Sequence, residues 1–275
     1  MAQTKSPSSP SRMLKWMGRR LAQSVANKPG EYTFLKPPSS FEQAVKNNQT
    51  GAVLNYRIRD KNDLSIAKQI FQEEHYNIDV MPRADEIRDE YASILAAGKT
   101  PLIIDCGGNI GMSAKYFADH YPKAKIVVIE PGDDNFALLS ENCFEPSIIP
   151  VHAAIAGSTR TGKAVDVGRG NCGLMVEDDP DGGLLFITIG DILAEHGSGD
   201  IVPFILKVDV EGFEEDVFGG DTSWLDEFYL LAIELHDWML PCEARSGNFL
   251  RAIAPLNRDF VSIGEIIFSI ANRGD

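Results

Sequence analysis

Residues 101–117 read PLIIDCGGNIGMSAKYF, and this stretch decides the fold. An apolar run ends on Asp105, the three glycines Gly107, Gly108 and Gly111 follow, and a helix-like segment comes next. The apolar run predicts a buried strand over 102–105, and the segment after the glycines predicts a helix over 113–120. Glycine adopts backbone angles that other residues avoid. Because it also has no Cβ, a ligand can lie against its main chain. The free N–H groups at the start of the helix would favour a carboxylate or phosphate, so we expect a ligand site at this turn.

The rest of the chain after residue 100 repeats this alternation of short apolar runs and helical stretches. Runs that are apolar on both faces and alternate with helices are typical of a parallel sheet covered on both sides. The last stretch, DFVSIGEIIFSI, predicts an antiparallel hairpin that turns near Gly264 and Glu265. The sequence therefore predicts an α/β fold with a mostly parallel, Rossmann-like sheet that ends in an antiparallel hairpin. We expect the other strands at 125–130, 148–155, 184–189, 203–209 and 229–236, and the other helices near 133–142, 191–196, 213–218 and 247–256.

Three segments differ in composition, which predicts three units. Residues 1–40 combine a Ser/Pro-rich tail, expected to be disordered, with a basic amphipathic helix. That helix either packs on its own domain or binds a membrane surface or a partner. Residues 41–100 predict a helical N-terminal cap, with Asp63 as the N-cap of one helix and Gly98 ending another. Residues 101–275 form the predicted cofactor-binding domain.

Composition and charge narrow the function. The chain has 275 residues, of which 44% are hydrophobic, and no apolar run approaches the ~18 residues that cross a bilayer. We read no secretory signal, and four scattered cysteines without a CxxC pair favour reduced thiols in a cytoplasmic protein. Residues 1–40 hold seven basic residues and one acid, so the remainder carries a net charge of −20. A body this acidic repels phosphate backbones, which argues against a nucleic-acid substrate.

The spacing of an acidic residue limits which ligands the glycine turn could bind. Glu130 ends the strand after the glycine turn, 25 residues beyond Asp105, where an acid typically binds ribose hydroxyls. A nicotinamide cofactor would require glycines where the turn has Asn109 and Met112, and no phosphate-loop Gly-Lys-Ser/Thr is present. Asp105 could accept hydrogen bonds from the ammonium group of an amino-acid tail. We therefore expect S-adenosylmethionine, with a tight turn that binds nothing as the alternative.

Five segments, in order, resemble the FkbM family of S-adenosylmethionine-dependent methyltransferases: DCGGNIGMSA, VIEP, VHAAIAG, ILKVDVEGFEEDVFGG and LAIELH. The resemblance covers about three fifths of the chain. It departs from the family pattern at one place: the family commonly has an acid directly after a Thr-Leu pair, whereas here Gly190 precedes Asp191. It implies a class I methyltransferase sheet and O-methylation of a hydroxyl on a small metabolite, polyketide or sugar. The expected cofactor-binding residues are Asp105, Gly107, Gly108, Asn109, Gly111, Ser113, Glu130, Pro131, Ala153, Ala154 and Asp209.

The expected catalytic residues follow two neighbouring strands. Lys207, Asp209 and Glu211 close the strand over 203–209, and His236 closes the next, so all four should meet at the edge that holds the glycine turn. We expect His236 to be the general base, because imidazole titrates near neutral pH, with Asp209 or Glu211 orienting it. Lys207 would pair with one of these carboxylates.

Three alternatives stay open from the sequence. A divalent metal could be held by Asp209, Glu211 and His236, although our assignment includes no metal. An NAD-linked oxidoreductase is disfavoured by the glycine spacing, and a non-catalytic adenosine-ligand-binding protein is disfavoured by the intact catalytic residues.

Overall fold

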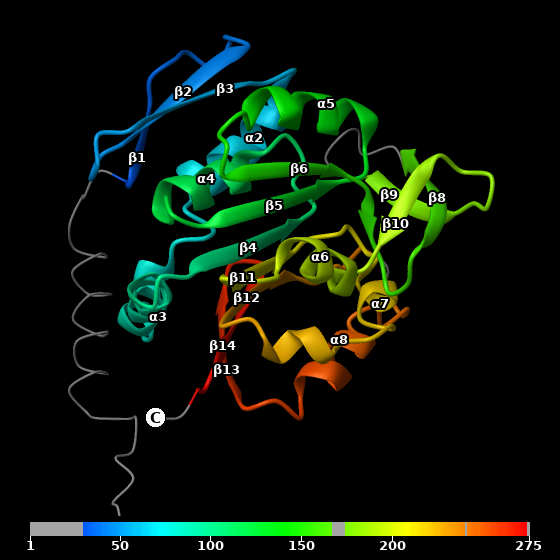
Figure 1. The fold of residues 1–275 in the computed structure, drawn as a ribbon. Helices are drawn as coiled ribbons and strands as arrows, with labels where there is room; N and C mark the ends of the chain where they lie inside the picture. The colour runs from blue at the N-terminus through cyan, green and yellow to red at the C-terminus, as the bar shows by residue number, and fades with distance from the viewer. Residues whose placement is uncertain (1–29, 167–173, 240, 274–275) are drawn as a thin grey trace, which may run out of the picture.

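The computed structural model describes residues 30–166, 174–239 and 241–273 (Figure 1). Its central sheet has the strand order β13-β14-β12-β11-β4-β5-β6. Neighbours are parallel except where β14 pairs with β12 and β13, which confirms the mostly parallel sheet with an antiparallel hairpin at its end. The strands are β4 (Thr100–Cys106), β5 (Lys125–Glu130), β6 (Ile148–His152), β11 (Ile201–Val208), β12 (Leu230–Glu234), β13 (Arg258–Ile263) and β14 (Ile266–Ala271).

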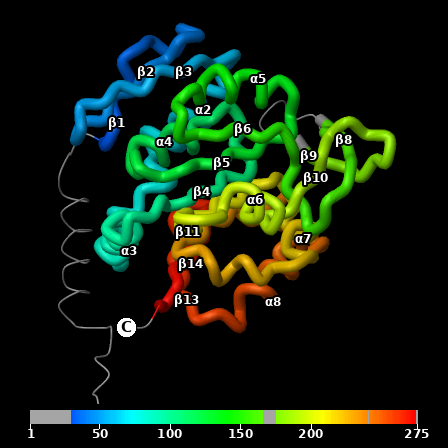
Figure 2. Tube along the Cα trace, in the orientation of Figure 1, coloured from blue at the N-terminus to red at the C-terminus, as the bar shows by residue number. Residues whose placement is uncertain are grey.

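Helices cover both faces of this sheet, as its apolar runs predicted. In β4, Ile103 packs into one core with Phe117, whereas Leu102 and Ile104 pack into a second core with Phe249. Figure 2 shows α2, α4 and α5 on one side of the sheet and α6 and α8 on the other. The helical elements are α2 (Lys61–Phe71), η1 (Ile78–Val80), α3 (Ala84–Ala96), α4 (Met112–His120), α5 (Asp133–Asn142), α6 (Ile189–His196), α7 (Glu214–Val217), η3 (Ser223–Asp226) and α8 (Gly247–Ile253).

The strand order places a crevice at one edge of the sheet. The chain runs from β4 outward through β5 to β6, then returns to the other side of β4 as β11. In open α/β sheets, ligands bind beyond the carboxyl ends of the strands at such a switch point. The glycine turn after β4 lies at that edge, next to the end of β11, where Asp209 N–H donates to the carbonyl of Cys106 (3.1 Å).

The N-terminal part is less helical than expected. Three strands, β1 (Tyr32–Phe34), β2 (Glu42–Asn47) and β3 (Val53–Arg57), form a small antiparallel sheet, so the expectation of a mostly helical segment over 41–100 is wrong for its first part. The polar residues of β2 obscure the alternation that marks a strand. A turn closed by Gly51 N–H donating to Asn47 O (2.9 Å) reverses the chain between β2 and β3. The expected basic helix lies outside the described residues.

The N-cap of α2 is Asp60 and not Asp63, so that expectation is wrong. Asp60 caps α2, because its carboxylate accepts from the N–H groups of Asn62 and Asp63 (2.8 and 3.1 Å). Asp63 is instead buried and paired with the Arg59 guanidinium (2.9 Å). Arg59 also donates to the Asn135 side chain (2.7 Å), which ties the start of α2 to α5.

A second small sheet replaces part of the expected parallel series. The run over 148–155 breaks at Ala153, where the chain leaves the central sheet, and the run at 184–187 pairs outside that sheet. Two strands of the small sheet, the second and the third, were not expected: the sequence of the second is mostly polar, and the third has only three apolar residues in a row. It consists of β7 (Ala154–Ile155), β8 (Arg160–Asp166), β9 (Leu174–Asp178) and β10 (Leu184–Ile187). In the parts of the chain that the structure describes, no helix has the length and apolarity of a membrane span.

Candidate active site

A cavity of about 380 Å³ lies at the carboxyl edge of the central sheet. α2 and the segment after it contribute Gln69, Ile70, His75 and Tyr76 to the cavity wall. Its volume falls within the ~300–1,000 Å³ of small-molecule sites. Of the residues expected from sequence, those that line the cavity are Gly107, Gly108, Asn109, Ser113, Glu130, Pro131, Ala153, Ala154, Lys207, Asp209, Glu211 and His236.

Close packing fixes the shape of the glycine turn. Gly107 has φ +86°, and a Cβ on it would overlap the carbonyl oxygen of Asp209. Glycine alone tolerates both conditions. The N–H groups of Gly107 and Gly108 donate to the carbonyl of Ile129 (3.0 and 2.9 Å), which joins the turn to β5. Gly111 does not line the cavity: a Cβ there would meet Cys143, so its smallness serves the packing of α4 on α5.

Asp105 lies beneath the cavity rather than in its wall. Its carboxylate is fully buried, accepts from the Ser113 hydroxyl (2.5 Å) and lies 2.9 Å from the Lys207 ammonium. Lys207 Nζ also donates to the carbonyl of Gly107 (2.9 Å). Burial opposes the charge on Lys207, but Asp105 outweighs it and the pKa of Lys207 is raised well above its usual value. The expected contact between Asp105 and a cofactor ammonium is therefore replaced by an ion pair that supports the turn.

Glu130 faces the cavity with its carboxylate held by backbone and side-chain donors. It accepts from the N–H of Asn109 (2.8 Å), the N–H of Gly132 (3.0 Å) and the Asn135 amide (3.0 Å). Burial raises the pKa of Glu130, whereas these hydrogen bonds lower it. A carboxylate has about four acceptor positions, so three bonds leave room for a ligand hydroxyl. Pro131 follows at the cavity wall.

Small apolar side chains also line the cavity. Ala153 and Ala154 lie where β6 ends and β7 begins, and both are buried beside Ile129 and Ile155. Small apolar side chains there leave a slot between the two sheets. The placement of an adenine ring in this slot stays a prediction.

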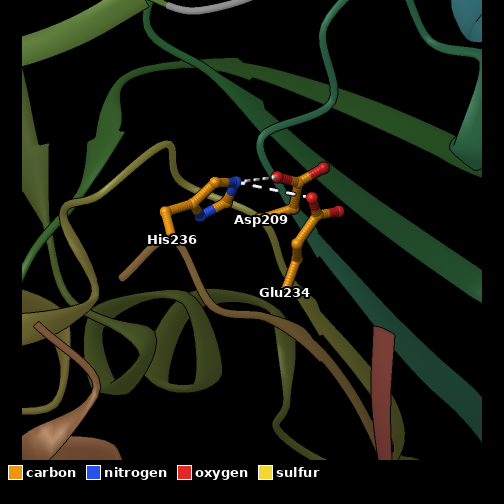
Figure 3. A group of neighbouring side chains, drawn as sticks. All are labelled: Asp209, Glu234 and His236. Atoms are coloured by element: carbon orange, nitrogen blue, oxygen red, sulfur yellow. Dashed lines mark ion pairs between the residues drawn. The ribbon is translucent and has the colours of Figure 1, made fainter. Parts of the chain in front are cut away.

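A carboxylate–histidine group lines the same cavity, and its Asp209 packs against Gly107 of the glycine turn. His236 is 2% exposed, and its Nδ1 lies 2.6 Å from a Glu214 carboxylate oxygen. Its Nε2 faces Asp209 and Glu234, each with a carboxylate oxygen at 3.6 Å (Figure 3). Glu211 lies slightly farther, at 3.9 Å. We call Asp209, Glu234 and His236 the rim cluster.

The charges around His236 change its expected role. Burial would lower the pKa of His236, but the hydrogen bond to Glu214 and the charges of Asp209 and Glu211 raise it to about 9. Burial and the charge of Asp209 raise the pKa of Glu234 to about 7. A protonated imidazole has no lone pair with which to accept a proton. At neutral pH His236 in this arrangement stabilises negative charge, so the expected general-base role requires that its proton first be displaced.

Sequence reasoning missed three contributors to the site. Glu214 is fully buried behind His236, and the acidic run after Gly212 gave no indication which carboxylate would turn inward. Glu234 precedes His236 by two residues, the spacing of one strand face, and this pattern could have found it. Asn135 supports Glu130 from α5, which only the tertiary structure reveals.

Fold and site together define a class of protein. The sheet has the strand order and the single reversed strand of class I, Rossmann-like methyltransferases. The chain is 29% identical over 174 residues to the hexuronic acid methyltransferase AglP of Haloferax volcanii. This match covers 59% of this chain and 69% of that protein. It is also 29% identical over 199 residues to Methyltransferase 1 of Beauveria bassiana, covering 62% of this chain and 73% of that protein.

A solved structure and the family search complete the comparison. The N-terminal domain of human METTL16 in complex with SAH has a TM-score of 0.39 and 13% identity, covering 98% of this chain and 96% of that chain. No model of a known protein family matches the chain, so the resemblance to the FkbM family stays a prediction. The two methyltransferase relatives, with the sheet and the glycine turn, support an S-adenosylmethionine-dependent methyltransferase.

Proposed function

We propose that the protein transfers the methyl group of S-adenosylmethionine to a hydroxyl of a small metabolite or sugar, as the FkbM resemblance implies. One observation carries the proposal: the glycine turn, Glu130 and the rim cluster all line a single cavity. Cofactor and acceptor could thus meet in one enclosed space. We also propose a cytoplasmic location, which the free thiols of Cys106 and Cys143 support.

In this proposal the turn side of the cavity holds the cofactor, which supplies a methyl group activated on a sulfonium. Glu130 accepts hydrogen bonds from the ribose hydroxyls, and the N–H groups at the start of α4 attract the carboxylate of the amino-acid tail. Ala153 and Ala154 leave space for the adenine ring. Asp105 and Lys207 act from below, by fixing the carbonyl of Gly107 and with it the turn.

The rim cluster would receive the acceptor hydroxyl. The acceptor oxygen attacks the methyl carbon in line with the carbon–sulfur bond, which breaks to release S-adenosylhomocysteine, and a carboxylate of the rim cluster, Asp209 or Glu234, accepts the hydroxyl proton. The cationic His236 stabilises the negative charge that develops on the oxygen, while the carboxylates of Asp209 and Glu234 orient the hydroxyl. The protein's contribution is therefore positioning and charge, because the cofactor brings the reactive group.

The cavity mouth favours a polyhydroxylated acceptor. Trp238 lines the cavity and is 62% exposed, so its ring offers a flat apolar face at the opening. Glu211 and Glu265 line the same cavity and can accept hydrogen bonds from hydroxyls. The name of the AglP relative, a hexuronic acid methyltransferase, supports a sugar. The same carboxylates would repel phosphate, which supports our exclusion of nucleic acid.

Isothermal titration calorimetry tests the cofactor first. We expect S-adenosylmethionine and S-adenosylhomocysteine to bind at micromolar concentrations and NAD not to bind; the reverse result would favour the oxidoreductase. A screen of sugar and phenolic acceptors with methyl-labelled cofactor then distinguishes an enzyme from a binding protein. Cofactor binding without transfer to any hydroxyl acceptor would contradict the proposed reaction. Asp209→Asn should lower kcat with little change in cofactor affinity.

A further inference from the structure

We propose that the rim cluster binds one divalent metal ion, with Asp209, Glu234 and His236 as its protein ligands. Binding of the ion does not depend on the proposed function, but its role in the reaction does. The ion would lie at the carboxyl ends of β11 and β12, where we propose that the acceptor hydroxyl binds. The ligands differ from the set that the sequence suggested, because Glu234 takes the place of Glu211.

The geometry of the cluster suits a single ion. Asp209 follows β11, while Glu234 ends β12 and His236 follows it, so two adjacent parallel strands bring the three side chains together. One ligand atom from each residue can be chosen so that all lie within 4.8 Å of one another. Metal–ligand distances of about 2.0–2.2 Å separate neighbouring ligand atoms by about 3 Å and opposite ones by about 4 Å. Small side-chain rotations therefore suffice to close the site.

The orientation of His236 is an independent observation that points to an ion. The imidazole is 98% buried, being 2% exposed, and Nδ1 is fixed by Glu214 at 2.6 Å. Ligand histidines almost always use their second nitrogen in this way. Nε2 then aims between two carboxylate oxygens at 3.6 Å, which is too far for a hydrogen bond and suited to an ion between them. Figure 3 shows this convergence.

The charge balance of the cavity also favours a cation. Lys207 Nζ lies 2.9 Å from Asp105 and 3.6 Å from Asp209, and His236 Nδ1 lies 2.6 Å from Glu214, so the carboxylates of this region outnumber its two buried basic side chains. The carboxylates of Asp209, Glu211, Glu234 and Glu265 line the same cavity. Nearby carboxylates repel one another in a partly dehydrated site, and a divalent ion removes that repulsion. One imidazole with two carboxylates suits Mn²⁺ or Zn²⁺ better than the all-oxygen preference of Mg²⁺.

The ion would supply a way to remove the proton of the acceptor hydroxyl. It takes the place of the Nε2 proton, which leaves to solvent, and its open positions can bind the acceptor hydroxyl. A bound divalent ion lowers the pKa of a coordinated oxygen, so the hydroxyl proton leaves to solvent before or during methyl transfer. The attacking oxygen is thereby held in the same cavity as the cofactor.

Manganese binding tests the site without any activity assay. The full chain is titrated with Mn²⁺ at ~0.15 M salt, which screens diffuse surface attraction, and free Mn²⁺ is followed by electron paramagnetic resonance. We expect one ion per chain, and Glu234→Gln and His236→Gln should each weaken binding by about 10-fold or more. Glu265→Gln is the matched control: it removes one carboxylate from the same cavity but no ligand, and should change affinity less than twofold.

Two results would overturn the site. The first is wild-type protein that binds none of Mn²⁺, Zn²⁺ and Mg²⁺ in a saturable way. The second is a Glu265→Gln variant weakened as much as Glu234→Gln, which would mean diffuse charge attraction. Circular dichroism and melting curves check folding, and Glu234→Gln, partly exposed, carries the test if His236→Gln fails to fold. Calorimetry with S-adenosylmethionine separates the two proposals, since its failure removes the function but leaves the ion site standing.

Discussion

Replacing Lys207 with methionine should destabilise the whole fold, because this residue holds the only cation found against Asp105 in the described residues. Lys207 Nζ lies 2.9 Å from Asp105 and donates to the carbonyl of Gly107 at 2.9 Å, with both side chains buried. Methionine has a similar length and no charge. Lys207→Met therefore leaves a carboxylate that is buried at the centre of the sheet and keeps the Ser113 hydroxyl as a donor.

The magnitude follows from the geometry. Two unit charges at this distance attract by about 6 kcal/mol at an effective dielectric constant of about 20. Part of this is offset because the lysine no longer has to be dehydrated, and breaking a buried pair typically costs about 3–5 kcal/mol. At about 2–4 °C per kcal/mol for chains of this size, the melting temperature should fall by about 10 °C. Cofactor affinity should fall as well, because the carbonyl of Gly107 loses its donor.

Urea unfolding followed by far-ultraviolet circular dichroism measures the free energy of unfolding. The double variant Lys207→Met/Asp105→Asn serves as the control: the amide keeps an acceptor for Ser113 and removes the unpaired charge. We expect it to recover most of the lost stability. A single variant that loses less than about 1 kcal/mol, or a double variant as unstable as the single one, would refute the reasoning.

Three further changes test other parts of the structure. Gly107→Ala should abolish cofactor binding in calorimetry, whereas Gly98→Ala, which also has positive φ (+71°) but open space around its Cβ, should lose some stability and keep the affinity. Glu130→Gln should weaken S-adenosylmethionine binding by about 10-fold, since the N–H groups of Asn109 and Gly132 lose a charged acceptor; unchanged affinity would remove Glu130 from the site. Although burial opposes it, the hydrogen bond to Glu31 raises the pKa of His120 above 6.5. The stability from this pair is therefore fully present below about pH 6.5 and lost as the pH rises through the folded-state pKa, and His120→Gln should flatten that part of a melting-temperature profile.

Local pattern was enough to predict the backbone around the site. The apolar run before Asp105, the glycines and the helix after them are confirmed, because each depends on neighbours in sequence. The strand that ends on Glu130 and the C-terminal hairpin are confirmed for the same reason. The pattern failed at β2 and β8, where mostly polar residues form strands that depend on pairing with a neighbour, and at β9, whose apolar run is only three residues long.

The sequence by itself determined that a glycine turn follows a buried strand, and that acidic residues and a histidine end the neighbouring strands. Tertiary structure decided what each of these side chains does. Register sets Lys207 directly opposite Asp105, so the acid expected to bind a ligand is consumed by a buried ion pair. The fold brings Glu214 behind His236 and Asp209 in front of it, and these carboxylates raise the pKa of the expected base. These outcomes depend on charges that are 22 to 102 residues apart or lie across a strand end, and only the folded sheet sets their distances and the dielectric between them.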